Sequence, residues 1–292
     1  MLDPAQLAAL AAVHRRGSFE LAASELHVTP SAISQRLKAL EERMGILLIR
    51  RGQPCRTTAA GLRLIRHFDE VNLMEAELAR DLPQIAPAHL SLRIALNADS
   101  LASWVLPALA QVEGFLFDLV IDDQDHSLDW LRRGEVLAAI TAHAKPLPSC
   151  EMFPLGALRY YASCSPAFHQ KHFAQGVDAN SLSHAPALCF NDKDQLQNRW
   201  GQKVTGRQIA FPNHHMASSQ AFVDAAKLGL GWGMNPSVLI AQDLAAGRLV
   251  EVIPDTPLDV MLYWQYTRLA APALAPLTKA LRAAAALALV QT

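Results

Sequence analysis

The stretch that decides the fold runs from Phe19 to Glu41 and reads FELAASELHVTPSAISQRLKALE. Its first part, Phe19 to Leu26, has the apolar spacing of a short helix, and His27-Val28 fits a tight turn. Thr29 then stands at an N-cap position and Pro30 at the first helical position. The apolar residues that follow have helical spacing and are Ile33, Leu37, Leu40 and Met44. Helix, short turn and amphipathic helix together predict a helix-turn-helix.

The opposite face of this second helix carries side chains suited to double-stranded DNA. Hydroxyl, amide and ammonium groups contact base edges and phosphates in the major groove, and the N-terminal turn of the helix would enter that groove. Ile46 to Arg50, a turn over Arg51 to Cys55 and the return Arg56-Thr57 predict a two-stranded wing whose arginines reach the flanking backbone. The residues predicted to contact DNA are Thr29, Pro30, Ser31, Ser34, Gln35, Lys38, Arg50, Arg51 and Arg56.

The charge distribution separates a basic N-terminal module from a larger acidic one. The 292 residues contain 26 Lys and Arg against 27 Asp and Glu, a formal net charge of −1. Thr29 to Arg66, however, contains eight basic and two acidic residues, whereas the chain from Pro83 onward contains 15 basic and 17 acidic ones. Nucleic acid is therefore a candidate partner of the first module alone, and a solvated basic face is the alternative.

The N-terminal region resembles the LysR-type transcriptional regulators. The resemblance is carried by Phe19-x-x-Ala22-Ala23-x-x-Leu26-x-Val28-Thr29-x-Ser31-Ala32-x-Ser34-x-x-Leu37-x-x-Leu40-Glu41, then Leu48-x-Arg50 and Thr57-Thr58-x-x-Gly61. It implies a bacterial, cytoplasmic regulator that binds a double-stranded DNA operator, acts with RNA polymerase, forms a homodimer or homotetramer and is not an enzyme. A chance helix-turn-helix match in a tRNA- or protein-binding module is the alternative.

A long amphipathic helix is predicted from Thr58 to about Leu82. Its seam, which includes one carboxylate, consists of Leu64, Phe68, Val71, Glu75, Leu78 and Leu82. After a DNA-binding head such a helix is most simply a dimerisation helix, as the resemblance also implies, and a helix packed on its own domain is the alternative. Pro83 and Pro87 mark the hinge that follows.

The second module has the strand, polar loop and helix order of an α/β domain. The predicted strands and the polar residues after them are Leu90 to Leu96 before Asn97-Ala98-Asp99-Ser100, Phe117 to Ile121 before Asp122-Asp123, and Leu137 to Thr141 before Ala142-His143. Ligands of such folds collect at the carboxyl ends of the strands. A second lobe begins near Ala162, and Met261 to Tyr266 carries the chain back to the first.

The expected fold class is mixed α+β and α/β. It comprises a winged helix-turn-helix over residues 1–58, a linker and dimerisation helix with its hinge over 59–87, and an effector-binding domain over 88–292. Lobe I of that domain is expected at about 88–161 and 268–292, and lobe II at about 162–267. The resemblance implies this two-lobed fold, which is similar to periplasmic amino-acid-binding proteins, with the ligand between the lobes.

The second module narrows the resemblance to the ArgP/LysG branch. The segments that carry it are Asn97-Ala98-Asp99-Ser100-Leu101-Ala102-x-Trp104-x-Leu106-Pro107-Ala108-Leu109, Leu131-Arg132-Arg133-Gly134-Glu135-Val136, Leu147-Pro148-Ser149-Cys150, Ser218-Ser219-x-Ala221-Phe222-Val223 and Met261-Leu262-Tyr263-Trp264. The branch implies lysine or arginine as effector and activation of a basic-amino-acid exporter gene. The alternatives are another small effector, such as an aromatic acid, or an amino-acid-binding protein or enzyme without DNA function.

A basic amino acid presents one carboxylate and two cationic groups, so its site needs hydroxyls and N–H groups at one end and carboxylates at the other. Serines at helix starts are expected to hold the carboxylate, and aspartates after strand ends the cation. The predicted effector residues are Ser100 and Ser218, then Asp99, Asp123, Asp192 and Asp194, with further hydrogen bonds from Thr141 and Asn191. The alternative for each is an ordinary cap or a solvated loop.

No cofactor other than the effector, no metal and no membrane partner are expected. The cysteines Cys55, Cys150, Cys164 and Cys189 lie far apart, without metal-ligand spacing. The glycines of Gly229-x-Gly231-x-Gly233 follow a predicted helix, whereas a dinucleotide-binding loop would open one. The N-terminus lacks the basic segment followed by an apolar segment that is typical of a signal peptide, so none is expected. Trp104 is expected in the core rather than in the cleft.

Overall fold

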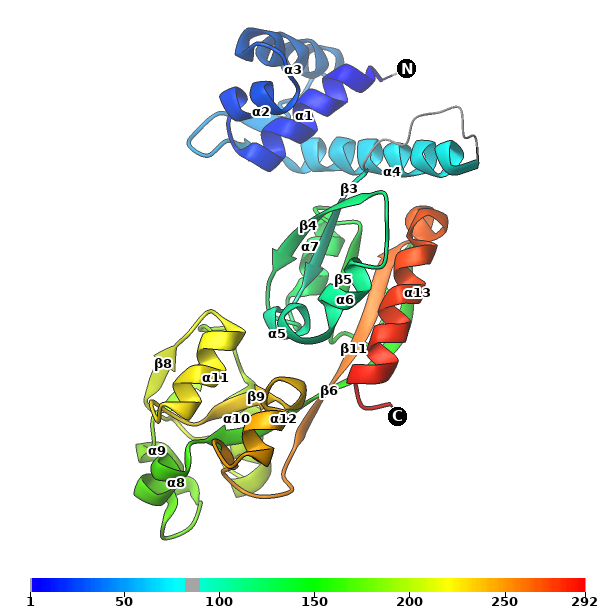
Figure 1. The fold of residues 1–292 in the computed structure, drawn as a ribbon. Helices are drawn as coiled ribbons and strands as arrows, with labels where there is room; N and C mark the ends of the chain where they lie inside the picture. Colours follow the sequence, from blue (N-terminus) through cyan, green and yellow to red (C-terminus); the bar gives the residue numbers. More distant parts are fainter. Residues whose placement is uncertain (1, 82–89, 292) are drawn as a thin grey trace.

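The N-terminal head of the chain is a winged helix-turn-helix in the computed structural model, which describes residues 2–81 and 90–291 (Figure 1). Its elements are α1 (Pro4–Arg16), α2 (Phe19–Glu25), α3 (Pro30–Met44), β1 (Ile49–Arg50) and β2 (Arg56–Thr57). The predicted hinge residues Pro83 and Pro87 and the seam residue Leu82 lie outside the described ranges.

The helix α3 begins where the sequence predicts it. The Thr29 hydroxyl accepts a hydrogen bond from the Ala32 N–H at 3.2 Å, and Pro30 is the first helical residue. Gly45 ends the helix in the left-handed conformation. Of the predicted apolar stripe, the first three residues are buried in the core of the head, whereas Met44 is 38% exposed because it lies in the last turn.

Three residues of the motif that resembles LysR-type regulators hold the wing against the neighbouring helices. The Glu41 carboxylate accepts hydrogen bonds from the backbone N–H groups of Leu48 at 2.7 Å and Ile49 at 3.1 Å. The Thr58 hydroxyl donates to the Leu47 carbonyl at 2.9 Å. A Cβ on Gly61 would lie 2.6 Å from the Leu48 carbonyl oxygen, so only glycine allows the helix that follows the wing to approach it this closely.

The long helix α4 (Ala59–Asp81) contacts both parts of its own chain. Leu64 and Ile65 are buried in the core of the head, and Leu73 is buried in the core of the C-terminal domain. Of the predicted seam, Leu64 thus packs within the chain, while Leu78 and Glu75 are exposed. The alternative of a helix packed on its own domain therefore applies to the first turns.

The C-terminal domain is built on one mixed sheet with the strand order β10-β6-β11-β5-β3-β4, and β9 pairs with β6. The strands are β3 (Leu90–Leu96), β4 (Phe115–Ile121), β5 (Ala138–Thr141), β6 (Cys150–Cys164), β9 (Gly233–Pro236), β10 (Val250–Glu251) and β11 (Leu258–Thr267). The first three are parallel, and β6 and β11 are long antiparallel strands that run from lobe I into lobe II (Figure 1). These two strands join the lobes.

Helices cover the sheet in both lobes. In lobe I they are α5 (Ala98–Ser100), the π-helix η1 (Leu101–Val105), α6 (Leu106–Leu109), α7 (Ser127–Arg133), the 3-10 helix η2 (Arg268–Ala270) and α13 (Ala271–Ala288). Lobe II contains α8 (Pro166–Phe173), α9 (Ala179–His184), β7 (Ala187–Cys189), α10 (Leu196–Thr205), β8 (Asn213–His215), α11 (Ser219–Lys227) and α12 (Ser237–Ala245). No described helix is long and apolar enough to cross a membrane.

Tryptophans occupy the cores of both lobes. In lobe I, Trp104 is buried, as predicted, and the buried Trp264 donates to the Thr278 hydroxyl of α13 at 3.0 Å. In lobe II, Trp200 and Trp232 are fully buried with their ring centroids 5.3 Å apart. Because rings of this size bury much apolar area, they contribute much of the hydrophobic stabilisation of each lobe.

The wing anchor gives a first prediction. Replacing Glu41 by Ala removes two charge-assisted hydrogen bonds and leaves two backbone N–H groups without their acceptor, which should cost about 2 kcal/mol of unfolding free energy. Glu42→Ala is the control, because Glu42 is exposed and forms a solvent-exposed ion pair with Lys38 at 3.7 Å. Chemical denaturation of both variants measures the difference; equal stabilities would contradict the anchoring role.

Candidate functional site

The residues predicted to contact DNA all lie at the surface of the head, exposed or half-buried. On α3, Ser31, Gln35 and Lys38 are exposed and Ser34 is half-buried. The wing residues Arg50, Arg51 and Arg56 and the helix-start residues Thr29 and Pro30 are exposed as well. Arg51 donates to the Ser34 hydroxyl at 3.5 Å, which joins the wing to the helix.

A second candidate site is the cleft where the two lobes meet. Lobe I contributes the loops after β3 and β4, and lobe II contributes the loop after β7, the start of α11 and β9. The lining residues are Asn97, Ala98, Asp99, Asp122, Asp123, Gln124, Phe190, Asp194, Leu196, Ser219, Phe222, Met234 and Pro236. They include four carboxylates but no lysine or arginine, so the cleft is strongly acidic.

Asp99 joins the lobes at one end of the cleft. Its carboxylate accepts hydrogen bonds from the Ser219 hydroxyl of lobe II at 2.6 Å and from the Tyr160 hydroxyl of β6 at 2.9 Å. Burial raises the pKa of Asp99, because desolvation outweighs these two hydrogen bonds, and the nearby Asp194 raises it further. Asp99 therefore lies where a positive charge would be favourable.

Asp123 is the least compensated carboxylate of the cleft. It accepts the Asp125 N–H at 2.8 Å, its one side-chain acceptor bond among the described residues. Burial, together with the charges of Asp125 and Asp194, raises its pKa to about 6. Asp194 itself is held in its own loop, where it accepts N–H groups of Phe190 and Leu196 at 2.9 and 3.0 Å.

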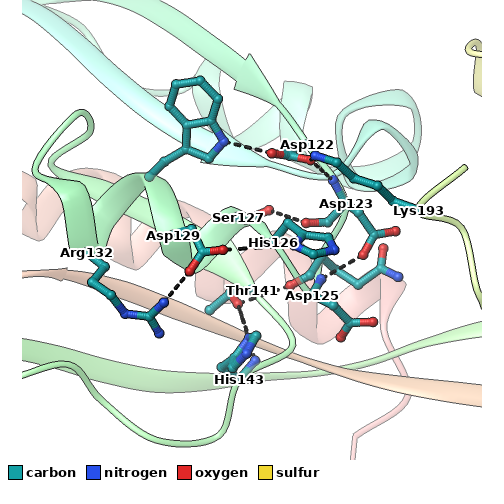
Figure 2. Close-up of polar contacts among 12 residues, drawn as sticks. Asp122, Asp123, Asp125, His126, Ser127, Asp129, Arg132, Thr141, His143 and Lys193 are labelled. Carbon is teal, nitrogen blue, oxygen red and sulfur yellow. Dashed lines mark hydrogen bonds and ion pairs between the residues drawn. The ribbon is translucent and has the colours of Figure 1, made fainter. Parts of the chain in front are cut away.

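Asp122 contacts the opposite lobe through an ion pair (Figure 2). Its Oδ1 accepts the Lys193 ammonium at 2.7 Å and the Asp123 N–H at 2.9 Å, and its Oδ2 accepts the Trp130 indole N–H at 2.9 Å. Burial alone would raise the pKa of Asp122, but the hydrogen bonds from Lys193, Trp130 and the backbone lower it overall. Among the described residues, Lys193 is the one lysine or arginine bound to these four carboxylates.

Two family models match the chain. The bacterial regulatory helix-turn-helix protein of the lysR family matches residues 4–62, and the LysR substrate binding domain matches residues 87–286. The chain belongs to the LysR family of transcriptional regulators. This confirms the predicted family and fold class and the prediction that the protein is a regulator and not an enzyme.

Relatives that match nearly the whole chain place this regulator in the ArgP/LysG group, as predicted. LysG of Mycobacterium tuberculosis is 43% identical over 285 residues, which cover 97% of this chain and 94% of that protein. The crystal structure of ArgP from M. tuberculosis matches with a TM-score of 0.83 at 42% identity, covering 100% of both chains. Full-length LysG from Corynebacterium glutamicum with bound effector Arg has a TM-score of 0.72 at 36% identity, covering 99% of this chain and 100% of that chain.

The predicted effector residues are only partly brought together. Asp99, Asp123 and Asp194 line the cleft, and Ser100 lies next to it with a buried hydroxyl that has no hydrogen-bond partner among the described residues. The Thr141 hydroxyl is buried and donates to the Gln124 carbonyl at 3.1 Å (Figure 2).

The three remaining predicted effector residues lie outside the cleft lining. Ser218 is exposed and caps α11, where its hydroxyl accepts the Ala221 N–H. Asn191 accepts the Lys193 N–H, and the Asp192 side chain is 93% exposed, beside His215. Asn191 and Asp192 line a separate hollow on the surface of lobe II, which Asp194 also reaches.

Several residues at the cleft were not predicted from the sequence to contact the effector. Asn97 is 3% exposed, lines the cleft and has both side-chain polar atoms unpartnered among the described residues. Asn97 and Asp122 directly follow predicted strands, and Ser219 is next to the predicted Ser218, so a local signal existed for these three. Lys193 and Trp130 reach the site only through tertiary contacts, for which the sequence carries no signal.

A polar junction connects lobe I to the head. Arg93 of β3 forms an ion pair with Asp118 at 3.1 Å and lies 3.3 Å from the His14 ring of α1. The other nitrogen of that ring contacts the Thr57 hydroxyl of the wing at 2.9 Å. Arg93 also lies over the Trp130 ring, 5.9 Å from its centroid. Side-chain contacts therefore lead from Asp122 in the cleft through Trp130, Arg93 and His14 to the wing.

The raised pKa of Asp123 gives a second prediction. In the pH range above 4, the unfolded chain ionises Asp123 more readily than the folded protein does, so the charge destabilises the native state at pH 7.5. Asp123→Asn keeps an acceptor for the Asp125 N–H and should raise the unfolding free energy at pH 7.5, on the order of 1 kcal/mol allowing for partial exposure. The gain should shrink as the pH falls towards 4.

Thermal unfolding at several pH values measures this effect. Asp192→Asn is the matched control, because the Asp192 side chain is almost fully exposed and should show no such gain. A loss of stability in Asp123→Asn at pH 7.5, or an equal gain at pH 4, would show that the Asp123 charge is not the cause.

Proposed function

We propose that this LysR-type regulator binds an operator through its head and responds to a basic amino acid, lysine or arginine, held between the lobes. The observation that carries the proposal is the acidic cleft: four aspartates line it, and lysine and arginine are absent from its lining. A ligand that neutralises them must be cationic. The bound effector Arg of the C. glutamicum LysG structure supports the same ligand class.

Charge separates this effector from the alternatives. An aromatic acid is an anion with no cationic group and would meet only like charges at Asp99, Asp122 and Asp123. A neutral amino acid has one ammonium, which could pair with one carboxylate and leave the rest uncompensated. Lysine and arginine carry a second cation at the end of a side chain, so they can compensate carboxylates at both ends of the cleft.

The buried amide of Asn97 supplies the complementary group for the effector carboxylate. Both its polar atoms lack partners among the described residues, and an unpartnered buried amide costs free energy that a ligand hydrogen bond would recover. Its Nδ2 is a donor, and Asn97 lies beside the acidic residues of the same cleft. An amino acid placed with its carboxylate at Asn97 directs its side chain into the aspartates.

The regulatory output rests on the head and on α4. Effector binding changes the lobe contacts, and the junction at Arg93 and His14 transmits that change to the wing. The exposed apolar side chains Met74 and Leu78 of α4 suit the homodimer or homotetramer that would pair two heads on an operator. The proposed output is activation of a gene that encodes an exporter of basic amino acids. The regulator would act on this gene together with RNA polymerase, in the cytoplasm.

The effector assignment predicts a selective thermal shift. L-Lysine and L-arginine should raise the unfolding temperature. At a free ligand concentration one hundred times the dissociation constant, binding adds about 2.7 kcal/mol to the free energy of unfolding. L-Citrulline and L-norleucine, which lack the side-chain cation, should not raise the unfolding temperature. The shift should be smaller at pH 5 than at pH 7.5, because Asp123, with a pKa of about 6, is mostly protonated at pH 5. An equal response to citrulline would refute a cation-specific site.

The DNA-binding assignment predicts two distinguishable defects, measured on a fragment selected by the protein from random-sequence DNA. Gln35→Ala should weaken binding to the selected fragment by about 1–3 kcal/mol and leave non-specific binding unchanged. Lys38→Ala should weaken all DNA binding and reduce the slope of log affinity against log salt by about 1. Lys171→Ala, an exposed lysine on α8 of lobe II, is the control. Wild-type affinity and salt slope in both head variants would contradict the assignment of α3.

A further inference from the structure

The cleft contains one contact between oppositely charged groups of the two lobes, between Asp122 and Lys193. We propose that Asp122 is the subsite for the effector's side-chain cation, and that Lys193 is a built-in competitor which the effector displaces. This inference rests on the function proposed above, because it names the group that recognises the second cation of a basic amino acid.

Asp122 is built as a fixed cation receptor. Its two oxygens are held by the Trp130 indole N–H and by the Asp123 backbone N–H, both at 2.9 Å, and both donors belong to lobe I. Its side chain is 14% exposed, so its orientation is set by packing as well as by hydrogen bonds. A carboxylate oriented in this way offers the same geometry to any ammonium or guanidinium.

Lys193, by contrast, is an exchangeable occupant. It lies in the loop between β7 and α10 of lobe II, and its side chain is 50% exposed. Among the residues that the structure describes, its one polar partner beyond its own loop is Asp122 Oδ1. This pair contributes little stability, because water competes for the half-exposed lysine and its side chain loses rotamer freedom. Lys193 can therefore leave at small cost.

The surroundings favour the effector over Lys193. Asp123 follows Asp122 directly, lines the same cleft and has no cationic partner within hydrogen-bond distance among the described residues. A guanidinium has several N–H donors in a planar fork, so it can pair with Asp122 and a neighbouring carboxylate at once, which the single Lys193 ammonium does not do. At the other end of the ligand, the buried and unpartnered Asn97 amide provides contacts that Lys193 does not make.

The exchange has a consequence for affinity. A tethered cation competes with the effector at an effective concentration set by its short loop, so its presence weakens effector binding. Removing its positive charge should therefore tighten binding of a basic amino acid. A lysine that contacted the effector carboxylate would behave in the opposite way.

The test is calorimetric titration of L-arginine into the full-length protein and two variants. Lys193→Gln should bind L-arginine at least threefold more tightly than the wild type, and Asp122→Asn at least tenfold more weakly. Lys171→Gln is the control for a lost surface lysine and should leave the affinity unchanged. Agmatine, which is arginine without its carboxylate, should also bind Lys193→Gln more tightly than the wild type.

The outcomes separate this inference from the proposed function. If the wild type binds neither L-arginine nor L-lysine, the proposed function fails and this inference fails with it. If the wild type binds L-arginine but Lys193→Gln binds it equally or more weakly, the competitor role is wrong while the proposed function stands. Should Asp122→Asn fail to fold, as judged by its unfolding transition, the Lys193→Gln titrations decide alone.

Discussion

Carboxylates that share a cleft must be compensated, and this constraint shapes the C-terminal domain. Asp99, Asp122 and Asp123 come from lobe I and Asp194 from lobe II, and burial raises the pKa of Asp99 and Asp123. A fold selected only for stability would replace such groups, because an uncompensated buried charge costs more than a neutral side chain. The cationic effector proposed above would supply the missing charge.

The architecture places this cleft where a ligand can act on the whole chain. The long strands β6 and β11 pass through both lobes, so the lobes are joined by continuous hydrogen-bonded backbone and not by a loose linker (Figure 1). Across the cleft the lobes meet at Asp99 with Ser219 and at Asp122 with Lys193. Both contacts use carboxylates of the proposed effector site, so a ligand that binds these groups alters the contact between the lobes.

Asp122 also connects the cleft to the head. Asp122 accepts the Trp130 N–H, the Trp130 ring lies under Arg93, and Arg93 reaches His14 of α1. Burial is the main cause that lowers the pKa of His14, and the charge of Arg93 adds to it, so the neutral ring is favoured between Arg93 and Thr57. A neutral ring has one donor and one acceptor nitrogen, which suits a neighbour that donates on one side.

Much of the fold was predictable because it depends on local patterns. Thr29, Pro30 and the spacing of Ile33, Leu37 and Leu40 specify α3, and the polar residues after strands mark the cleft edge. The choice between neighbours was not predictable: Asp194 lines the cleft while Asp192 is exposed, and Ser219 faces it while Ser218 caps the helix. Such choices depend on how a loop turns, and contacts such as Lys193 with Asp122 depend on how two lobes meet.

The central claim is that a cation recognised in the cleft changes how the head binds DNA. The most direct measurement is fluorescence anisotropy of a selected DNA fragment titrated with the full-length protein, in saturating L-arginine and in the same concentration of L-citrulline. Arginine should change the DNA affinity by about 1–3 kcal/mol, the usual size of an allosteric coupling, and citrulline should leave it unchanged. Identical DNA affinities in arginine, citrulline and buffer, with arginine shown to be bound, would contradict it.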